Sequence, residues 1–105
     1  MKKAECCPTA RQVPRKEFSE EDLGNLCKAL GHPVRVKLLR ILIDRGECIS
    51  GDLAEEFSLA QSTVSEHLRI LKDAGLVDGT IDGSRRCYCV NGKTLSELKD
   101  MIAGI

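Results

Sequence analysis

The feature that most constrains this chain is a change of apolar period at Gly75. Before Gly75, apolar residues recur at spacings of three and four in four successive segments, the period of a helix with one buried face. After it, two short β-like runs at 76–81 and 86–90 flank the turn-forming Asp82-Gly83-Ser84. Residues 94–102 then return to the helical period. We expect a mainly α, α+β domain with the element order α-α-α-α-β-β-α.

Capping and stop residues place the four helices that precede Gly75. Ser, Pro and acidic residues are typical of helix starts, and glycine is typical of helix ends. The expected helices run from the Ser19 cap to Gly31, from Pro33 to Arg45-Gly46, from the Ser50 cap to Phe57, and from Gln61 to Ala74. In the second helix, Val34, Leu38, Leu39, Ile41, Leu42 and Ile43 form the apolar part, while Arg35, Lys37 and Arg40 are expected to face outward.

Length and composition favour a single small domain. The chain has 105 residues, with 16 Lys and Arg balanced by 16 Asp and Glu. Residues 1–17 have the composition of a flexible arm with a cysteine pair, and residues 18–105 form the expected domain. No apolar run reaches the ~20 residues of a membrane span, and the chain start lacks a secretory pattern. We therefore expect a cytoplasmic protein without a membrane partner.

Two short helices joined by the three-residue turn 58–60, followed by a hairpin, are the plan of a winged helix-turn-helix. The second helix of such a pair fits the major groove of duplex DNA, and the hairpin reaches the backbone or the minor groove. Glu66 is discordant on that helix, because a carboxylate repels phosphate unless it accepts a hydrogen bond from cytosine. The candidate DNA-contacting residues are Gln61, Ser62, Thr63, Ser65, His67 and Arg69 on the helix, with Arg85 and Arg86 on the hairpin.

Three motifs make the sequence resemble the ArsR/SmtB family of metalloregulatory repressors. They are LGHPVR at 30–35, LAQSTVSEHL at 59–68 and LKDAGLV at 71–77, and the likeness covers roughly residues 22–103. The resemblance implies a homodimer, packed through its first and last helices, that binds a palindromic double-stranded operator. It also implies repression that a metal or metalloid relieves. The family usually has Pro at position 62 and a basic residue or His at 66, where this chain has Ser and Glu.

Six cysteines suggest what the protein senses. Thiolates bind soft ions, and a trivalent metalloid takes three of them. Cys6 and Cys7 on the arm can supply two ligands and Cys48 the third, which favours arsenite or antimonite as the effector, with Cd or Zn as the alternative. Some arsenite sensors that the sequence resembles use an adjacent pair on the arm with a cysteine near position 48. The commoner Cys-Val-Cys motif of the third helix is replaced here by residues 49–51.

Cys87 and Cys89 form a second candidate pair of metal ligands. They alternate with Tyr88 and Val90 on an expected strand, where residues two apart share a face. We expect Tyr88 and Val90 to point into the core and both thiols to point outward. Cys27 falls on the apolar stripe of the first helix, so we expect it to pack in the core.

Other functions remain open from the sequence. Oxidation of a thiol pair, Cys87 with Cys89 or Cys6 with Cys48, would make a redox-responsive repressor of the same fold. A winged-helix module that binds only proteins fits the neutral net charge and Glu66. An enzyme is disfavoured, because the sequence lacks a His/carboxylate pair, a nucleophile motif and a phosphate loop.

Overall fold

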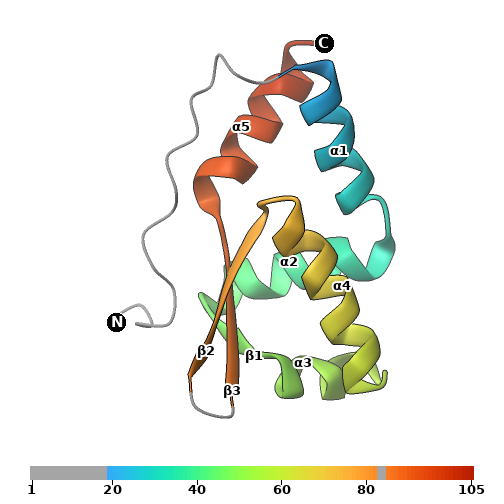
Figure 1. The fold of residues 1–105 in the computed structure, drawn as a ribbon, viewed down its shortest axis with the longest axis vertical. Helices are drawn as coiled ribbons and strands as arrows, with labels where there is room; N and C mark the ends of the chain where they lie inside the picture. The colour runs from blue at the N-terminus through green and yellow to red at the C-terminus, as the bar shows by residue number, and fades with distance from the viewer. Residues whose placement is uncertain (1–18, 83–84) are drawn as a thin grey trace.

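The computed structural model describes residues 19–82 and 85–105, without the side chains of residues 48–50, 80–82 and 85. The expected arm at 1–17 lies outside the described residues. The predicted winged helix-turn-helix is confirmed (Figure 1), with one additional short strand before the third helix. In chain order the elements are α1 (Glu20–Leu30), α2 (Pro33–Arg45), β1 (Cys48–Ile49), α3 (Ser50–Phe57), α4 (Gln61–Asp73), β2 (Val77–Asp82), β3 (Arg85–Val90) and α5 (Gly92–Ala103).

Local hydrogen bonds explain where the helices begin and end. Ser19 and Asp22 form a reciprocal capping box at the start of α1, each side chain accepting from the other's backbone N–H. His32 caps α2, its Nδ1 accepting from the backbone N–H of Val34 at 3.1 Å. Gly46 and Gly75 both have positive φ, at 85° and 89°, so each ends its helix in a backbone conformation that other residues rarely adopt.

The core is aliphatic and joins all five helices to the β2–β3 hairpin, which we call the wing. α1 and α5 lie side by side at one end of the molecule, and α3 lies at the other end beside the start of α4 (Figure 1). Tyr88 is the core residue that the wing's second strand contributes, as predicted. The largest fully buried side chains are Leu38, Leu42, Leu53, Leu68, Leu71, Leu76, Leu98, Val64, Val77 and Asn91.

The three strands form one antiparallel sheet with the order β1-β3-β2. β3 is therefore the central strand, with Cys48 of β1 on one side of Tyr88 and Gly79 of β2 on the other. The sequence did not predict β1, because a two-residue strand carries no alternation to recognise. Its pairing fastens the segment before α3 to the wing.

Several expected exposures are wrong. Cys87 and Cys89 are both buried, not outward, in a strand that α2 and α3 contact. Cys27 is exposed, since the buried face of α1 is centred on Leu26 and Ala29. In α2, Arg35 is half-buried rather than outward, and Ile43, one of the apolar residues of this helix, is exposed.

Candidate nucleic-acid interface

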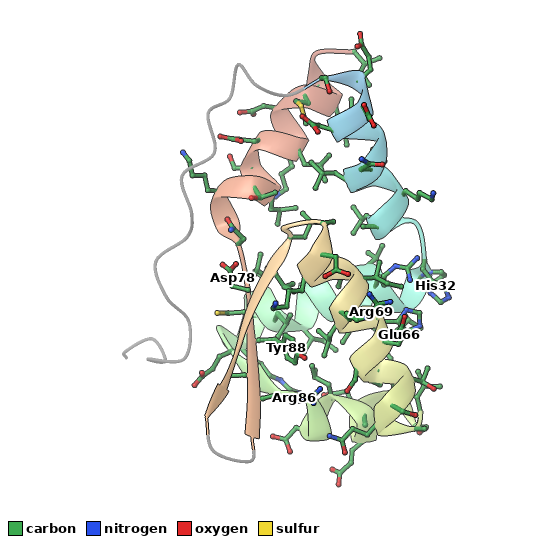
Figure 2. The ribbon with its side chains drawn as sticks, viewed as in Figure 1. His32, Glu66, Arg69, Asp78, Arg86 and Tyr88 are labelled. Carbon is green, nitrogen blue, oxygen red and sulfur yellow. The ribbon has the colours of Figure 1, made fainter. Side chains whose placement is uncertain are left out.

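A hollow of about 390 Å³ lies between α4 and β3. Figure 2 shows Glu66 and Arg69 on the α4 side and Arg86 and Tyr88 on the wing side. Its lining includes three cations and three hydroxyls, a set of donors suited to the oxygens of a phosphate backbone. Its lining residues are Ser62, Ser65, Glu66, Arg69 and Lys72 from α4, with Arg86 and Tyr88 from β3.

The helical period of α4 explains why these side chains gather on one face. Val64, Leu68 and Leu71 are buried against the core, so the residues between them are left at the surface. The start of α4 also lacks a side-chain cap, because its N-cap residue is Ala60. The backbone N–H groups of Gln61 and Ser62, at the start of that first turn, can therefore donate to an anion.

The turn between α3 and α4 fixes how α4 projects. Ser58 has a positive φ of 54°, and it is the one non-glycine residue with positive φ among those described. The backbone N–H of Leu59 donates to the carbonyl oxygen of Ala54 at 3.3 Å, and that of Ser58 donates to Glu55 at 3.3 Å. This is the geometry that ends a helix through a left-handed residue.

Arg69 is held by two carboxylates of its own helix. Its Nη1 lies 2.8 Å from Oδ2 of Asp73, its Nε lies 3.2 Å from Oε1 of Glu66, and its Nη2 donates to Oε2 of Glu66. The hydrogen bond from Arg69 lowers the pKa of Glu66, and the same bond raises the pKa of Arg69. Both groups are therefore charged at neutral pH, and their charges largely cancel.

His67 faces α2 rather than the hollow. Its ring centroid is 4.5 Å from that of His32, and its Nδ1 lies 3.1 Å from Nη1 of Arg35. Arg35 in turn donates from Nε to the carbonyl oxygen of Ala29 at 2.6 Å. Burial lowers the pKa of His67, and the nearby His32 and Arg35 lower it further, against the opposing effect of Glu66. The neutral ring thus ties α4 to the start of α2.

Gly79 sets the position of Tyr88 in the hollow. The two residues face each other across the β2–β3 ladder. A Cβ atom on residue 79 would lie 2.8 Å from both Cδ1 and Cε1 of the tyrosine ring. The tyrosine ring therefore packs directly against the backbone of residue 79, in space that any side chain larger than glycine would fill.

The structure brings together four of the residues that the sequence singled out: Ser62, Ser65, Arg69 and Arg86. Gln61 and Thr63 are exposed at the start of α4 but do not line the hollow, and the side chain of Arg85 is outside the described residues. Sequence reasoning missed Lys72 and Tyr88. Continuing the helical spacing from Ser65 and Arg69 would have reached Lys72, whereas Tyr88 was assigned to the core alone.

The six cysteines differ in how far the structure describes them and in whether their thiols are free. Cys6 and Cys7 lie outside the described residues, and Cys48 is described only by its backbone in β1. Cys27 and Cys87 are free thiols, whereas Cys89 is disulfide-bonded, so Cys87 and Cys89 are not bonded to each other. Within residues 19–82 and 85–105, no three His, Cys, Asp or Glu side chains are grouped to hold a metal ion.

This fold, with a surface helix and a wing that share one basic hollow, defines a winged helix-turn-helix DNA-binding protein. Residues 32–78 match the family model described as bacterial regulatory protein, arsR family. The chain is 34% identical over 93 residues to the HTH-type transcriptional regulator CmtR of Mycobacterium tuberculosis, covering 85% of this chain and 78% of that protein. The chain belongs to the ArsR family of transcriptional regulators.

Two solved structures share the fold. One is described as a possible transcriptional regulator for arsenical resistance, with 32% identity and a TM-score of 0.69, covering 76% of this chain and 81% of that one. The other is a homodimeric winged helix-turn-helix DNA-binding domain from Mycobacterium bovis, with 28% identity and a TM-score of 0.69, covering 90% and 86%. These relatives are regulators, which fits a non-enzymatic role. None of the helices in the described part of the chain is long and apolar enough to cross a membrane.

Proposed function

We propose that this protein is a transcriptional repressor that binds operator DNA as a homodimer and leaves it when arsenite or antimonite binds cysteine thiolates. The observation that carries the DNA-binding part is the hollow between α4 and β3, where Arg69, Lys72 and Arg86 converge with two serine hydroxyls. A repressor acts by occupying its operator, so an effector that weakens DNA binding restores transcription.

The placement of polar groups supports two kinds of DNA contact, with bases near the start of α4 and with phosphates along the hollow. Gln61 and Thr63 are exposed at the N-terminal end of the helix, where base edges are contacted in helix-turn-helix proteins. Lys72 and Arg86 lie further back, on the two walls of the hollow. Phosphate contacts of this kind orient a protein on the duplex, and base contacts supply the sequence preference.

The helices at the far end support a homodimer. α1 and α5 pack together at the end of the molecule opposite α3 (Figure 1), so a second copy that packs there leaves both hollows free. Ile102 and Ile105, at the end of the chain, are 47% and 91% exposed. The similar Mycobacterium bovis domain is described as homodimeric.

The cysteine chemistry supports a thiophilic effector. We assign Cys6, Cys7 and Cys48 as its ligands, because three thiolates suit a trivalent metalloid. Divalent ions that bind thiolates, such as Cd or Zn, would compete for the same atoms. Residue 48 is paired with Tyr88, which lines the hollow, so ligation at Cys48 acts on the strand that forms one wall. Coupling of this kind is typically ~1–3 kcal/mol and is reciprocal between effector and DNA.

A redox trigger is the second candidate, and the disulfide at Cys89 favours it. In such a switch two thiols join, giving two electrons and two protons to an oxidant such as hydrogen peroxide, which becomes water. Cys89 lies in the same strand as Arg86 and Tyr88, so a bond formed there also acts on the hollow.

One titration separates the two triggers. The fully reduced protein is bound to a labelled duplex covering the region upstream of its own coding sequence, and arsenite, Cd or hydrogen peroxide is added. We expect arsenite to release the wild type but not Cys6→Ser, Cys7→Ser or Cys48→Ser. Cys27→Ser is the matched control, because Cys27 is an exposed free thiol on α1 and should respond normally.

Each other outcome has a defined meaning. Loss of the arsenite response only in the Cys87→Ser/Cys89→Ser variant would refute the assigned ligands. Release by peroxide but not by arsenite under strict reduction would favour the redox trigger. Absence of salt-dependent binding to any duplex would refute the DNA-binding function and leave a protein-interaction module.

A further inference from the structure

The strongest unexplained feature of the hollow is an acid–base cluster on α4. Every guanidinium nitrogen of Arg69 is engaged by a carboxylate: Nε and Nη2 by Glu66, and Nη1 by Asp73. Glu66 and Arg69 also line the hollow together with Lys72 and Arg86. A carboxylate at this position offsets one of the few cations that face the proposed DNA.

The cluster is open to exchange. The side chains of Arg69 and Glu66 are each 57% exposed, and that of Asp73 is 63% exposed. Exposed ion pairs are weak and screened by salt, so an incoming anion can replace a carboxylate at little cost. A backbone phosphate group, with its two non-bridging oxygens, offers the guanidinium the same bidentate geometry that the two carboxylate oxygens of Glu66 provide.

We propose that Arg69 is a phosphate-binding residue whose guanidinium is occupied by the Glu66 carboxylate in the free protein. When duplex DNA binds, a backbone phosphate group replaces that carboxylate on Arg69. Asp73 stays in contact and keeps the side chain extended along the helix. The exchange lowers the affinity for every duplex by the same factor, because the phosphate backbone carries no sequence. This inference rests on the proposed DNA-binding function and adds a residue that tunes it.

The opposing role for Glu66 is direct base contact, in which its carboxylate accepts a hydrogen bond from the amino group of cytosine. The two roles have opposite consequences. If Glu66 competes with phosphate for Arg69, it weakens binding to all DNA, so its removal strengthens binding. A base contact strengthens binding to one sequence, so its removal weakens binding to that sequence alone.

The test uses Glu66→Gln in the full chain. Dissociation constants are measured by fluorescence anisotropy at several KCl concentrations on two duplexes, the upstream region and a scrambled duplex of equal length and composition. We expect about threefold to tenfold tighter binding of both duplexes. We also expect the plot of log K against log salt to steepen by about one unit, the value of one added phosphate contact.

Two further variants make the result specific. Asp44→Asn removes the same charge near the end of α2, outside the hollow and outside α1 and α5, and should leave both affinities unchanged. The double variant Glu66→Gln/Arg69→Ala should not show the tighter binding of Glu66→Gln, because it lacks the Arg69 guanidinium that loss of the Glu66 carboxylate makes available to phosphate. Circular dichroism of each variant checks that α4 remains folded.

The outcomes are distinct. Two results would refute the competition between Glu66 and phosphate while leaving the proposed function in place. One is weaker binding of Glu66→Gln to the upstream duplex alone, and the other is tighter DNA binding that persists in the variant without Arg69. If the wild type binds neither duplex at any salt concentration, it is the proposed function that fails.

Discussion

The Nη1 atom of Arg35 lies 3.1 Å from the Nδ1 atom of His67, and this hydrogen bond joins the first turns of α2 to the middle of α4. Arginine is always a donor, so Nδ1 of His67 must accept and the ring must be neutral. A proton on Nδ1 would remove this bond and place a positive charge on the ring beside the Arg35 guanidinium. The pKa of His67 is accordingly lowered by burial and by these two neighbours.

Acid should therefore loosen the attachment of α4. Because the folded state lowers the pKa of His67, the neutral ring contributes stability that is complete above the ordinary histidine pKa of about 6.5 and is lost as the pH falls through the lowered value. We expect the melting temperature to fall by a few degrees between about pH 7.5 and about pH 5. His67→Gln, whose amide oxygen can still accept from Arg35, should show a smaller fall. An equal fall in both proteins would assign the pH dependence to other groups.

Gly79→Ala should disturb the hollow through Tyr88. The added methyl group would lie 2.8 Å from the ring, so either the ring or the strand must move. We expect a loss of about 1–3 kcal/mol in unfolding free energy, as for other overpacked sites, together with weaker DNA binding.

Gly24→Ala is the matched control for that change, because a Cβ at residue 24 meets no atom within 4 Å. Within the helix α1, alanine should stabilise the protein by about 0.5–1 kcal/mol. Urea unfolding measures both variants. If Gly79→Ala were as stable as the wild type, the close packing of Tyr88 on β2 would be refuted.

Substitutions at Ser58 should change the free energy of unfolding, because its backbone is left-handed. Ser58→Gly relieves a conformation that disfavours a Cβ by about 1–2 kcal/mol, but it also adds freedom to the unfolded chain. We expect a small net stabilisation, about 0.5 kcal/mol. Ser58→Val should destabilise by about 1 kcal/mol or more, because a β-branched side chain is least compatible with positive φ. Equal urea midpoints for the two variants would contradict the strained turn.

Lys72 and Arg86 should each contribute one phosphate contact. Lys72→Gln and Arg86→Gln are expected to weaken binding to all duplexes alike, and each should reduce the salt slope by about one unit. Lys28→Gln, on α1, provides the same loss of charge away from the hollow. A change confined to one DNA sequence would instead identify the residue as a base contact.

Much of this architecture follows from local sequence signals. Ser19, Pro33 and Gly75 mark helix boundaries because capping, fixed φ and positive φ act within a few residues. Ser62, Arg69 and Arg86, which the sequence predicts to contact DNA, line the hollow together, because helical spacing and hairpin position place them there.

The remaining features depend on contacts between distant segments. Cys87 and Cys89 are buried in a strand that α2 and α3 contact, and the pattern of a single strand does not reveal what covers its faces. Arg35 and His67 are 32 residues apart, and each alone has the pattern of a solvent-facing polar residue. The partial charge cancellation at Arg69 is, by contrast, a local feature, because Glu66 and Asp73 lie three and four residues away on the same helix.

The pairing of Cys48 with Tyr88 has a mechanical consequence. Antiparallel partners share hydrogen bonds, so the stretch that leads into α3 cannot slide without carrying the central strand along. The helix pair and the hairpin are therefore mechanically coupled through this short ladder, and a displacement of residue 48 is transmitted to both.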